Sequence, residues 1–245
     1  MSMWAVVTSP EGPALKTCEP PCPSANQSLV RVELVGICRT DTLVACGRLK
    51  APPGLVLGHE VSAIVERSQR FAEGQRVAIN PWWWCRGCAA CRSGFPYACP
   101  EASMLGLHRP GGLAEWLVIP DESLFAVEFD ARHAAYVEPV AATLAAADYL
   151  GADTSVVVPG QNRIARLTRR VLEALGFQVQ GEGVAQAGVE TGPESLRLLT
   201  EQLAPGATIV LKSRLPGPAD FDPVQLARKQ LRLQGAWCGD FARAI

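Results

Sequence analysis

Four cysteines lie close together in the segment CRGCAACRSGFPYAC, residues 85–99, and no other feature limits the fold of this chain as strongly. Their spacing is C-x2-C-x2-C-x7-C. The two short gaps allow three thiolates to converge on one tetrahedral ion, and the long gap, rich in turn-forming residues, brings the fourth thiolate back to it. A site closed by four thiolates is structural. The spacing therefore predicts a zinc-binding lobe with the ligands Cys85, Cys88, Cys91 and Cys99.

Two other interpretations of these cysteines stay open. Ferredoxin-type runs also combine two short gaps with a final Cys-Pro, and Pro100 follows Cys99, but their last gap has three residues rather than seven. Disulfides are the second alternative. The chain has nine cysteines, an odd number, and its first residues lack the pattern of a secretion signal, which argues for reduced thiols. Zinc is the favoured interpretation.

The composition is that of a folded protein that binds a small molecule. Hydrophobic residues make up 48% of the 245 residues and charged residues 19%, enough to bury one large core or two ordinary ones. The 23 basic and 24 acidic residues give no field of one sign, so we expect no nucleic-acid or membrane partner. No run reaches the roughly 18 apolar residues of a membrane span, and we expect a cytoplasmic protein.

The N-terminal half is predicted to be rich in β-strands. Apolar and polar residues alternate there between Gly, Pro and Ser punctuation, in residues 3–8, 29–37, 60–67, 75–81 and 111–120. A helical stretch follows, in which Pro139 suits the first turn of a second helical piece. Residues 151–154, GADT, then predict a hinge.

An α/β pattern begins after the hinge. Residues 155–180 predict a strand, a turn, a helix and a strand, with Asn162 as the helix N-cap and Gly176 at its end. A helix near 193–203 and strands at 207–213 and 231–237 continue an open sheet. The apolar face of the first helix is predicted to comprise Ile164, Leu167, Val171, Leu172 and Leu175.

Two short motifs offer further metal ligands. GICRTD, residues 36–41, contains Cys38, and LGHE, residues 57–60, contains His59. Alone, each is weak, because an isolated Cys is more often a small buried hydrophobe. The order of these motifs, the four-cysteine lobe, GGLAEWLVIP and a βαβ unit resembles the zinc-dependent medium-chain alcohol and polyol dehydrogenases, from about residue 3 to the end.

The resemblance implies an α+β protein of two domains. Residues 1–150 would form a GroES-like β-barrel domain that carries the structural-zinc lobe. Residues 151–245 would form a truncated α/β Rossmann-like domain. The sheet edge near residues 231–237 is expected to be exposed, which favours a homodimer.

The same resemblance implies a catalytic zinc in the first domain. Cys38 and His59 would be ligands, Glu138 of VEPVA the third, and Glu60 either an exchanging ligand or a residue behind the ligands. Three protein ligands leave one coordination position for a substrate. Zinc there would lower the pKa of a bound alcohol and stabilise the alkoxide, leaving the carbinol hydride free to move to a nicotinamide.

Residues next to Cys38 also match the family. Thr40 resembles the hydroxyl that removes the alcohol proton, with a helix cap as its alternative role, and Arg39 matches an arginine that contacts the cofactor pyrophosphate. Asp41 is expected to organise the turn. Leu43 stands where many members carry a histidine of the proton relay. Trp82, Trp83 and Trp84 are interpreted either as substrate-pocket residues or as a packed cluster.

The glycine motif expected of a dinucleotide-binding turn is incomplete. The turn VVVPGQNRIA supplies Gly160 as the first glycine, but Asn162 replaces the second and Ala165 the third. An acidic residue that binds the ribose hydroxyl is expected about 20 residues further on. Gln180 or Glu182 could occupy that place, and neither fits it well. The sequence then passes directly to a later segment of the family, so at least one βα unit is predicted to be missing.

The leading functional hypothesis is a zinc-dependent oxidoreductase that transfers a hydride between a small alcohol or polyol, or its carbonyl product, and NAD or NADP. It implies one structural and one catalytic zinc. A zinc-dependent lyase, hydratase or cyclase is the alternative from a different reaction class. A non-catalytic relative that has lost dinucleotide binding is the third hypothesis.

Overall fold

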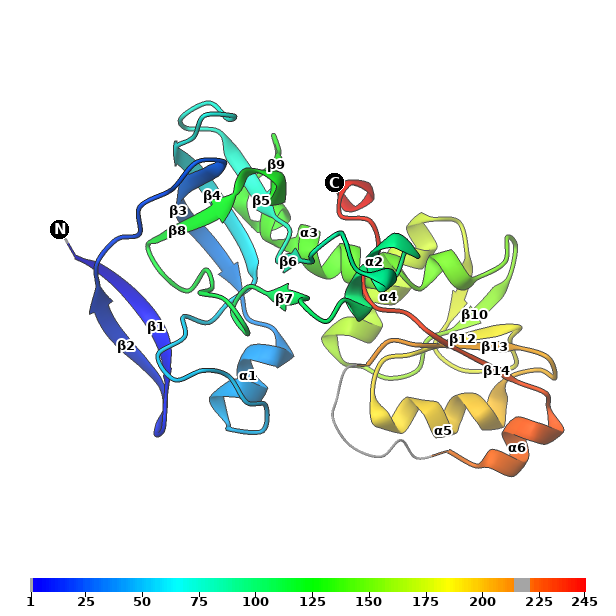
Figure 1. The fold of residues 1–245 in the computed structure, drawn as a ribbon. Coiled ribbons are helices and arrows are strands. Elements are labelled where there is room, and N and C mark those ends of the chain that lie inside the picture. Colours follow the sequence, from blue (N-terminus) through cyan, green and yellow to red (C-terminus); the bar gives the residue numbers. More distant parts are fainter. Residues whose placement is uncertain (1, 214–220) are drawn as a thin grey trace. The chain divides into compact units, whose positions relative to one another are not determined.

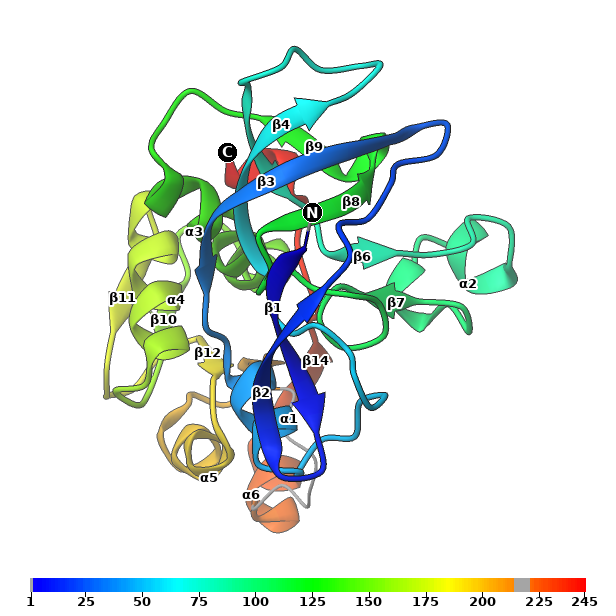
Figure 2. The same ribbon diagram turned by 90° about the vertical axis from the view of Figure 1, so that its left-hand side faces the viewer.

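The computed structural model describes residues 2–213 and 221–245 of the chain. Its contacts form two compact units, Met1–Glu138 with Ile245, and Pro139–Ala244. Figure 1 and Figure 2 together label the helices and strands of both units. The domain boundary expected at residue 150 stays a prediction.

The first unit is built on a five-stranded antiparallel sheet with the order β8-β3-β4-β5-β9. Figure 2 shows the long strand β3 between β4 and β8. Alternate residues of these strands point into one core, as the period of two requires; Val30, Val65 and Val77 are fully buried in it. The strands are β3 (Gln27–Gly36), β4 (Glu60–Arg67), β5 (Arg76–Ile79), β8 (Trp116–Pro120) and β9 (Leu124–Ala126).

Shorter elements complete this unit. An antiparallel hairpin joins β1 (Met3–Ser9) and β2 (Gly12–Cys18), and helix α1 (Arg39–Ala45) follows β3. The four-cysteine lobe lies between the two strands of a second hairpin, in which Trp82 pairs with Met104. Its elements are β6 (Trp82–Trp83), α2 (Ala89–Arg92), the 3₁₀ turn Pro96–Ala98 and β7 (Ser103–Met104).

Helix α3 (Ala131–Leu144) corrects one expectation. Pro139 lies inside a single helix instead of opening a second one. An internal proline costs about 3 kcal/mol of helix stability. Tertiary packing outweighs that cost, because Ala134, Val137 and Leu144 are almost fully buried on both sides of the proline.

The second unit is an α/β layer structure with a parallel sheet in the order β11-β10-β12-β13-β14. Val156 and Val158 pack with residues of α4, and Val157 between them packs with residues of α5, so the helices cover opposite faces (Figure 1). The strands are β10 (Ser155–Val157), β11 (Gln178–Gln180), β12 (Ala187–Glu190), β13 (Thr208–Leu211) and β14 (Arg232–Gly235), and the helices are α4 (Arg163–Ala174), α5 (Pro193–Gln202) and α6 (Pro223–Arg228).

Three features of this unit differ from, or add to, the expectations. The face of α4 that is completely buried comprises Ala165, Thr168 and Leu172, while Leu175 is 46% exposed. Strand β12 and helix α6 were not predicted. Only residues 181–186 join β11 to β12, without a helix, whereas a parallel crossover usually needs a dozen residues or more. This agrees with the predicted loss of a βα unit. Among the described residues, no helix is both long and apolar enough for a bilayer span.

Candidate functional site

Three potential ligands converge in the first unit. The ligand atoms of Cys38, His59 and Glu60 all lie within 4.8 Å of one another. Cys38 is the N-cap of α1, and Glu60 is the first residue of β4. His59 and Glu60 are 1% and 2% exposed, and Cys38 is half-buried. Thiolate, imidazole and carboxylate are the donors that zinc uses in proteins, and this set could hold one ion.

Glycines make the space for this cluster. Gly36 of β3 pairs with Glu60, and a Cβ atom at Gly36 would stand 2.2 Å from Oε2 of Glu60. Gly58 has φ +93°, and a Cβ atom there would come within 2.9 Å of the Leu113 side chain. A larger residue at position 36 or 58 would therefore disturb the positions of the Glu60 carboxylate and the His59 imidazole.

Asp41 connects the two segments that carry the potential ligands. Its Oδ2 accepts the backbone N–H of Cys38 at 2.8 Å, and its Oδ1 accepts that of Gly58 at 3.1 Å. The same Oδ1 lies 3.6 Å from Nδ1 of His59, an ion-pair distance longer than an ordinary hydrogen bond. Carboxylates behind a ligating histidine orient the ring and tune its basicity.

The pKa values of this pair are shifted in opposite directions. Burial by itself lowers the pKa of His59, but Asp41, Cys38 and Glu138 raise it well above its ordinary value of 6.5. Burial by itself raises the pKa of Asp41, but His59 and the N–H groups of Cys38 and Gly58 hold it below its ordinary value of 3.8. One base thus lies among several acidic groups, and a divalent cation would balance their charge.

The other predicted residues of this site occupy distinct positions. Glu138 is buried in α3 and raises the pKa of His59, but it is outside the set of three converging groups. This geometry favours Glu60 as the third donor, and Glu138 as the third ligand stays a prediction. Thr40 lies in α1 with its hydroxyl 3.9 Å from Sγ of Cys38, so it is not the helix cap. Arg39 is exposed at the start of α1.

The four lobe cysteines form a second converging set, with all four sulfurs within 4.8 Å of one another. Sγ of Cys85 is 3.6 Å from Sγ of Cys99 and 4.0 Å from Sγ of Cys91. A tetrahedral zinc with Zn–S bonds of about 2.3 Å has sulfur–sulfur edges of about 3.8 Å. A disulfide would need about 2.05 Å. The described geometry therefore fits one tetrahedral ion.

Backbone N–H groups also point at these sulfurs. Cys88 donates to Sγ of Cys85 at 3.3 Å, Cys91 to Sγ of Cys88 at 3.5 Å, and Glu101 to Sγ of Cys99 at 3.3 Å. Such donors stabilise thiolate charge. The bond from Cys91 is the main reason why the pKa of Cys88 is lowered to about 7.

The three tryptophans are part of the packing of the lobe. Trp82 and Trp84 both make edge-on contacts with the ring of Tyr97, at centroid distances of 5.5 and 5.6 Å. The guanidinium of Arg109 lies 5.2 Å above the Trp83 ring. These contacts support the interpretation as a packed cluster.

The predicted dinucleotide turn lies at the carboxyl end of β10 in the second unit. Gly160 has φ +94°, a conformation that favours glycine, and Ala165 is fully buried against the sheet. Asn162 is the N-cap of α4, as predicted, and its side chain accepts the N–H of Ala165 at 2.9 Å. That N–H would otherwise be available to a phosphate. Strand β11 ends at Gln180 without the acid that would hold a ribose hydroxyl.

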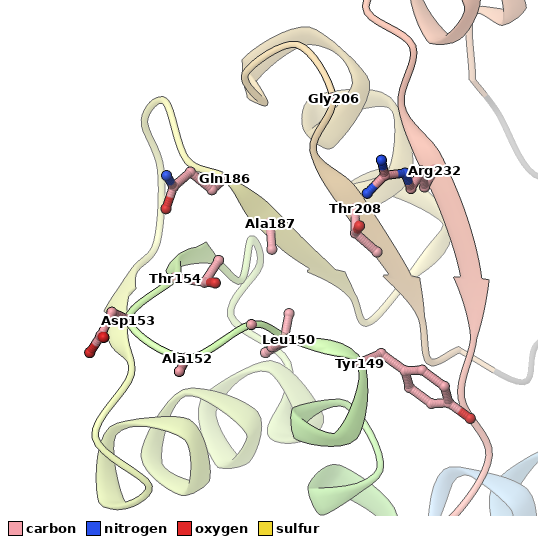
Figure 3. A pocket seen from close by; sticks show the side chains of 11 residues that line it. Tyr149, Leu150, Ala152, Asp153, Thr154, Gln186, Ala187, Gly206, Thr208 and Arg232 are labelled. Atoms are coloured by element: carbon pink, nitrogen blue, oxygen red, sulfur yellow. The ribbon is translucent and has the colours of Figure 1, made fainter.

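A hollow of about 480 Å³ lies at the opposite, amino-terminal edge of this sheet (Figure 3). Thr154 precedes β10, and Ala187, Thr208 and Arg232 are the first residues of β12, β13 and β14. Asp153 is the one acid among its lining residues. The hollow thus lacks a set of metal ligands and is separate from the Gly160 turn.

Comparison with known proteins identifies the relatives of this chain. Residues 24–129 match the alcohol dehydrogenase GroES-like domain. The chain is 36% identical over 134 residues to L-galactonate-5-dehydrogenase of Escherichia coli K12, a match that covers 51% of this chain and 39% of that protein. A solved candidate zinc-binding dehydrogenase of Sinorhizobium meliloti 1021, bound to NADP, is 26% identical with a TM-score of 0.88, covering 100% of this chain and 87% of that one. Residues 24–129 are therefore similar to the alcohol dehydrogenase GroES-like domain, and the whole chain resembles a solved dehydrogenase in fold.

A second curated relative extends the comparison. L-threonine 3-dehydrogenase of Stenotrophomonas maltophilia K279a is 30% identical over 129 residues, covering 49% of this chain and 38% of that protein. The matches thus span about two fifths of the length of these curated relatives. The chain has the expected fold class, a GroES-like β domain and a Rossmann-like α/β region. The family pattern did not reveal the two-sided hydrogen bonding of Asp41, whose only signal was an acid three residues after Cys38.

Proposed function

We propose that this chain is a zinc-dependent oxidoreductase that acts on a small alcohol or polyol, or on the carbonyl product. The observation that carries the proposal is the convergence of half-buried Cys38 with buried His59 and Glu60, held in place by Asp41, in a chain related to dehydrogenases. A buried imidazole and carboxylate that converge with a thiol on one point have no comparable use in an apolar core.

Zinc at this cluster would act as a Lewis acid that lowers the pKa of a bound alcohol. The residues of the chain have separate tasks. Cys38 and Glu60 supply negative charge, and His59 binds as a neutral donor whose proton must leave. Asp41 holds the segments of Cys38 and His59 in register. We assign to Thr40, whose hydroxyl lies 3.9 Å from Sγ of Cys38, the transfer of the alcohol proton toward solvent.

The relatives support the substrate class. L-galactonate-5-dehydrogenase and L-threonine 3-dehydrogenase are named for small hydroxylated acids. The NADP in the related Sinorhizobium structure supports NAD or NADP as the hydride acceptor. Zinc at Cys85, Cys88, Cys91 and Cys99 would stabilise the lobe without taking part in the reaction. Edge strand β14 supports the proposed homodimer, since an unpaired edge can accept another strand.

One observation favours a second candidate function. The side chain of Asn162 occupies the helix N-terminus at which a dinucleotide phosphate would bind. A set of converging metal ligands in the first unit, together with an occupied phosphate position in the second, fits zinc chemistry without a hydride, in a hydratase, lyase or cyclase.

A paired assay distinguishes the two. Zinc-loaded protein is incubated with small alcohols and polyols and either NAD or NADP, and NADH or NADPH is followed by absorbance; the same substrates are analysed for dehydration products without a nucleotide. Cys38→Ser is the inactive reference and Cys46→Ser, an exposed cysteine, the matched control. Reduction of the nucleotide, lost only in Cys38→Ser, supports the oxidoreductase. Product formation that needs Cys38 but no nucleotide supports the second candidate.

A further inference from the structure

The carboxyl ends of β10 and β12 define the place at which a dinucleotide would enter the second unit. These strands are neighbours in the sheet, and the chain leaves them toward opposite faces, into α4 after β10 and into α5 after β12. Open α/β sheets bind their ligands in the crevice at such a switch point. The loops Pro159–Asn162 and Thr191–Gly192 border it.

Two hydrogen bonds join these loops directly. Nδ2 of Asn162 donates to the carbonyl oxygen of Thr191 at 3.2 Å, and the Thr191 hydroxyl donates to the carbonyl oxygen of Pro159 at 3.3 Å. Thr191 is 3% exposed. Since Oδ1 of Asn162 also accepts the N–H of Ala165, both ends of the amide are in use. The Asn162 side chain therefore ties the two loops together and caps α4 at the same time.

A carboxylate lies beside the same turn. The side chain of Glu194 folds back over Gly192, with Oε1 2.7 Å from the position that a Cβ atom of Gly192 would take. The same oxygen is 4.0 Å from the corresponding position at Gly160. The exposed Glu194 carboxylate thus lies next to both loops, where its negative charge opposes an incoming phosphate. The Arg169 guanidinium does not point outward to offset this negative charge. Its Nη1 instead donates to the carbonyl oxygens of Val158 and Gly160 at 2.6 and 2.9 Å.

We propose that Asn162, Thr191 and Glu194 close this crevice against the pyrophosphate of a nicotinamide dinucleotide. A dinucleotide has to break the Asn162–Thr191 bridge, displace the cap of α4 and approach a carboxylate. The closure thus makes binding weak, and opening the crevice strengthens it. This inference rests on the proposed function only in its choice of nucleotide as the probe, since all the contacts that carry it lie within the second unit.

The test is a calorimetric titration of zinc-loaded protein with NADH and with NADPH. We expect the wild type not to saturate below about 1 mM, a binding free energy of about −4 kcal/mol. Asn162→Gly/Glu194→Gln removes the bridge and the charge, while glycine at an N-cap costs helix stability only a few tenths of a kcal/mol relative to asparagine. The double variant is expected to bind at least tenfold more tightly, and Glu194→Gln alone to gain a smaller factor.

The matched control is Asn26→Gly/Glu173→Gln, the same two exchanges at exposed positions outside the crevice. It is expected to bind like the wild type. Micromolar binding by the wild type would overturn the closure and support a nicotinamide-linked enzyme as it stands. The closure would also be overturned if neither Glu194→Gln nor the double variant bound the nucleotides more tightly than the wild type, with circular dichroism unchanged. Zinc content and alcohol binding are measured separately, so failure of the zinc proposal would be recognised independently.

Discussion

At the scale of residues, Asp41 holds together the two segments that carry the candidate metal ligands Cys38 and His59. Its carboxylate accepts N–H groups from the residue Cys38 and from Gly58, which precedes His59. Cys38 and His59 lie 21 residues apart in the chain, and a common acceptor fixes the distance between their backbones. The negative charge also raises the pKa of His59. Geometry and basicity at this site therefore depend on the same group.

Replacement of Asp41 by Asn removes the charge and turns one acceptor into a donor that faces an N–H group. We expect zinc affinity at the Cys38 cluster to fall by roughly 10- to 100-fold, the usual cost of losing a residue behind the ligands. Competition with a chromophoric chelator measures this zinc affinity. Asp130→Asn, at a position where the carboxylate is mostly exposed, is the control and should bind zinc normally. Equal affinities in Asp41→Asn and wild type would exclude the positioning role.

The pH dependence of zinc uptake follows from the direction of the His59 shift. Because the folded-state pKa is raised above 6.5, His59 stabilises the zinc-free protein fully below that pH, and this contribution is lost as pH rises through the folded value. Zinc requires the neutral ring. The affinity of this cluster should therefore increase with pH above 6.5, with proton release on binding. Calorimetry in buffers of different ionisation enthalpy counts these protons, and uptake without proton release would contradict the shift.

At the scale of single residues, spacing was informative where the ligands are close in sequence. The four lobe cysteines converge as their spacing predicted, since short gaps restrict where the thiols can go. Cys38, His59 and Glu60 required a resemblance to known enzymes, because the start of α1 and the start of β4, 21 residues apart, bring them together. The position of Glu138 outside the cluster depends on the packing of α3 and has no local sequence signal.

At the scale of elements, we expect the four-cysteine lobe to depend on a bound metal for its stability. Its helix α2 has four residues and no buried side chain, so it cannot be stable through packing alone. Tyr97 connects it to the hairpin through Trp82 and Trp84. Loss of the ion should therefore release the lobe while the five-stranded sheet, which has its own core, persists.

Cys99→Ser tests this dependence. We expect the zinc content to fall by one ion per chain, tryptophan emission to shift to longer wavelength, and proteolysis to begin within residues 85–99. Cys18→Ser, at an exposed cysteine of β2, is the matched control. An unchanged zinc content in Cys99→Ser would show that the four thiols do not form one site.

Elements were predictable where local pattern and packing agree. The predicted strand at residues 60–67 has the bounds of β4. The Asn162 cap was likewise correct, because capping is a local interaction. The helix break at Pro139 was wrong because burial on both sides outweighs the local cost of proline. The face of α4 was predicted correctly at Leu172 and missed Ala165 and Thr168, because close packing on the sheet selects these small residues over larger neighbours.

At the scale of the whole molecule, the two units differ in how closely they match the motifs of known dehydrogenases. The first carries both sets of potential metal ligands and matches the GroES-like domain over residues 24–129. The second has a five-stranded parallel sheet but joins β11 to β12 with only six residues. In its predicted dinucleotide turn, the Asn162 side chain accepts the N–H group that a phosphate would use. Metal chemistry is thus supported more strongly than dinucleotide chemistry.

The most direct test of the zinc-centred account is the number of zinc ions per chain in the wild type and in Cys38→Ser, by elemental analysis of protein purified without chelator. We predict two ions in the wild type and one in the variant, with the lobe ion retained. One ion in both proteins would mean that Cys38, His59 and Glu60 hold no zinc, and the proposed enzyme activity would be withdrawn.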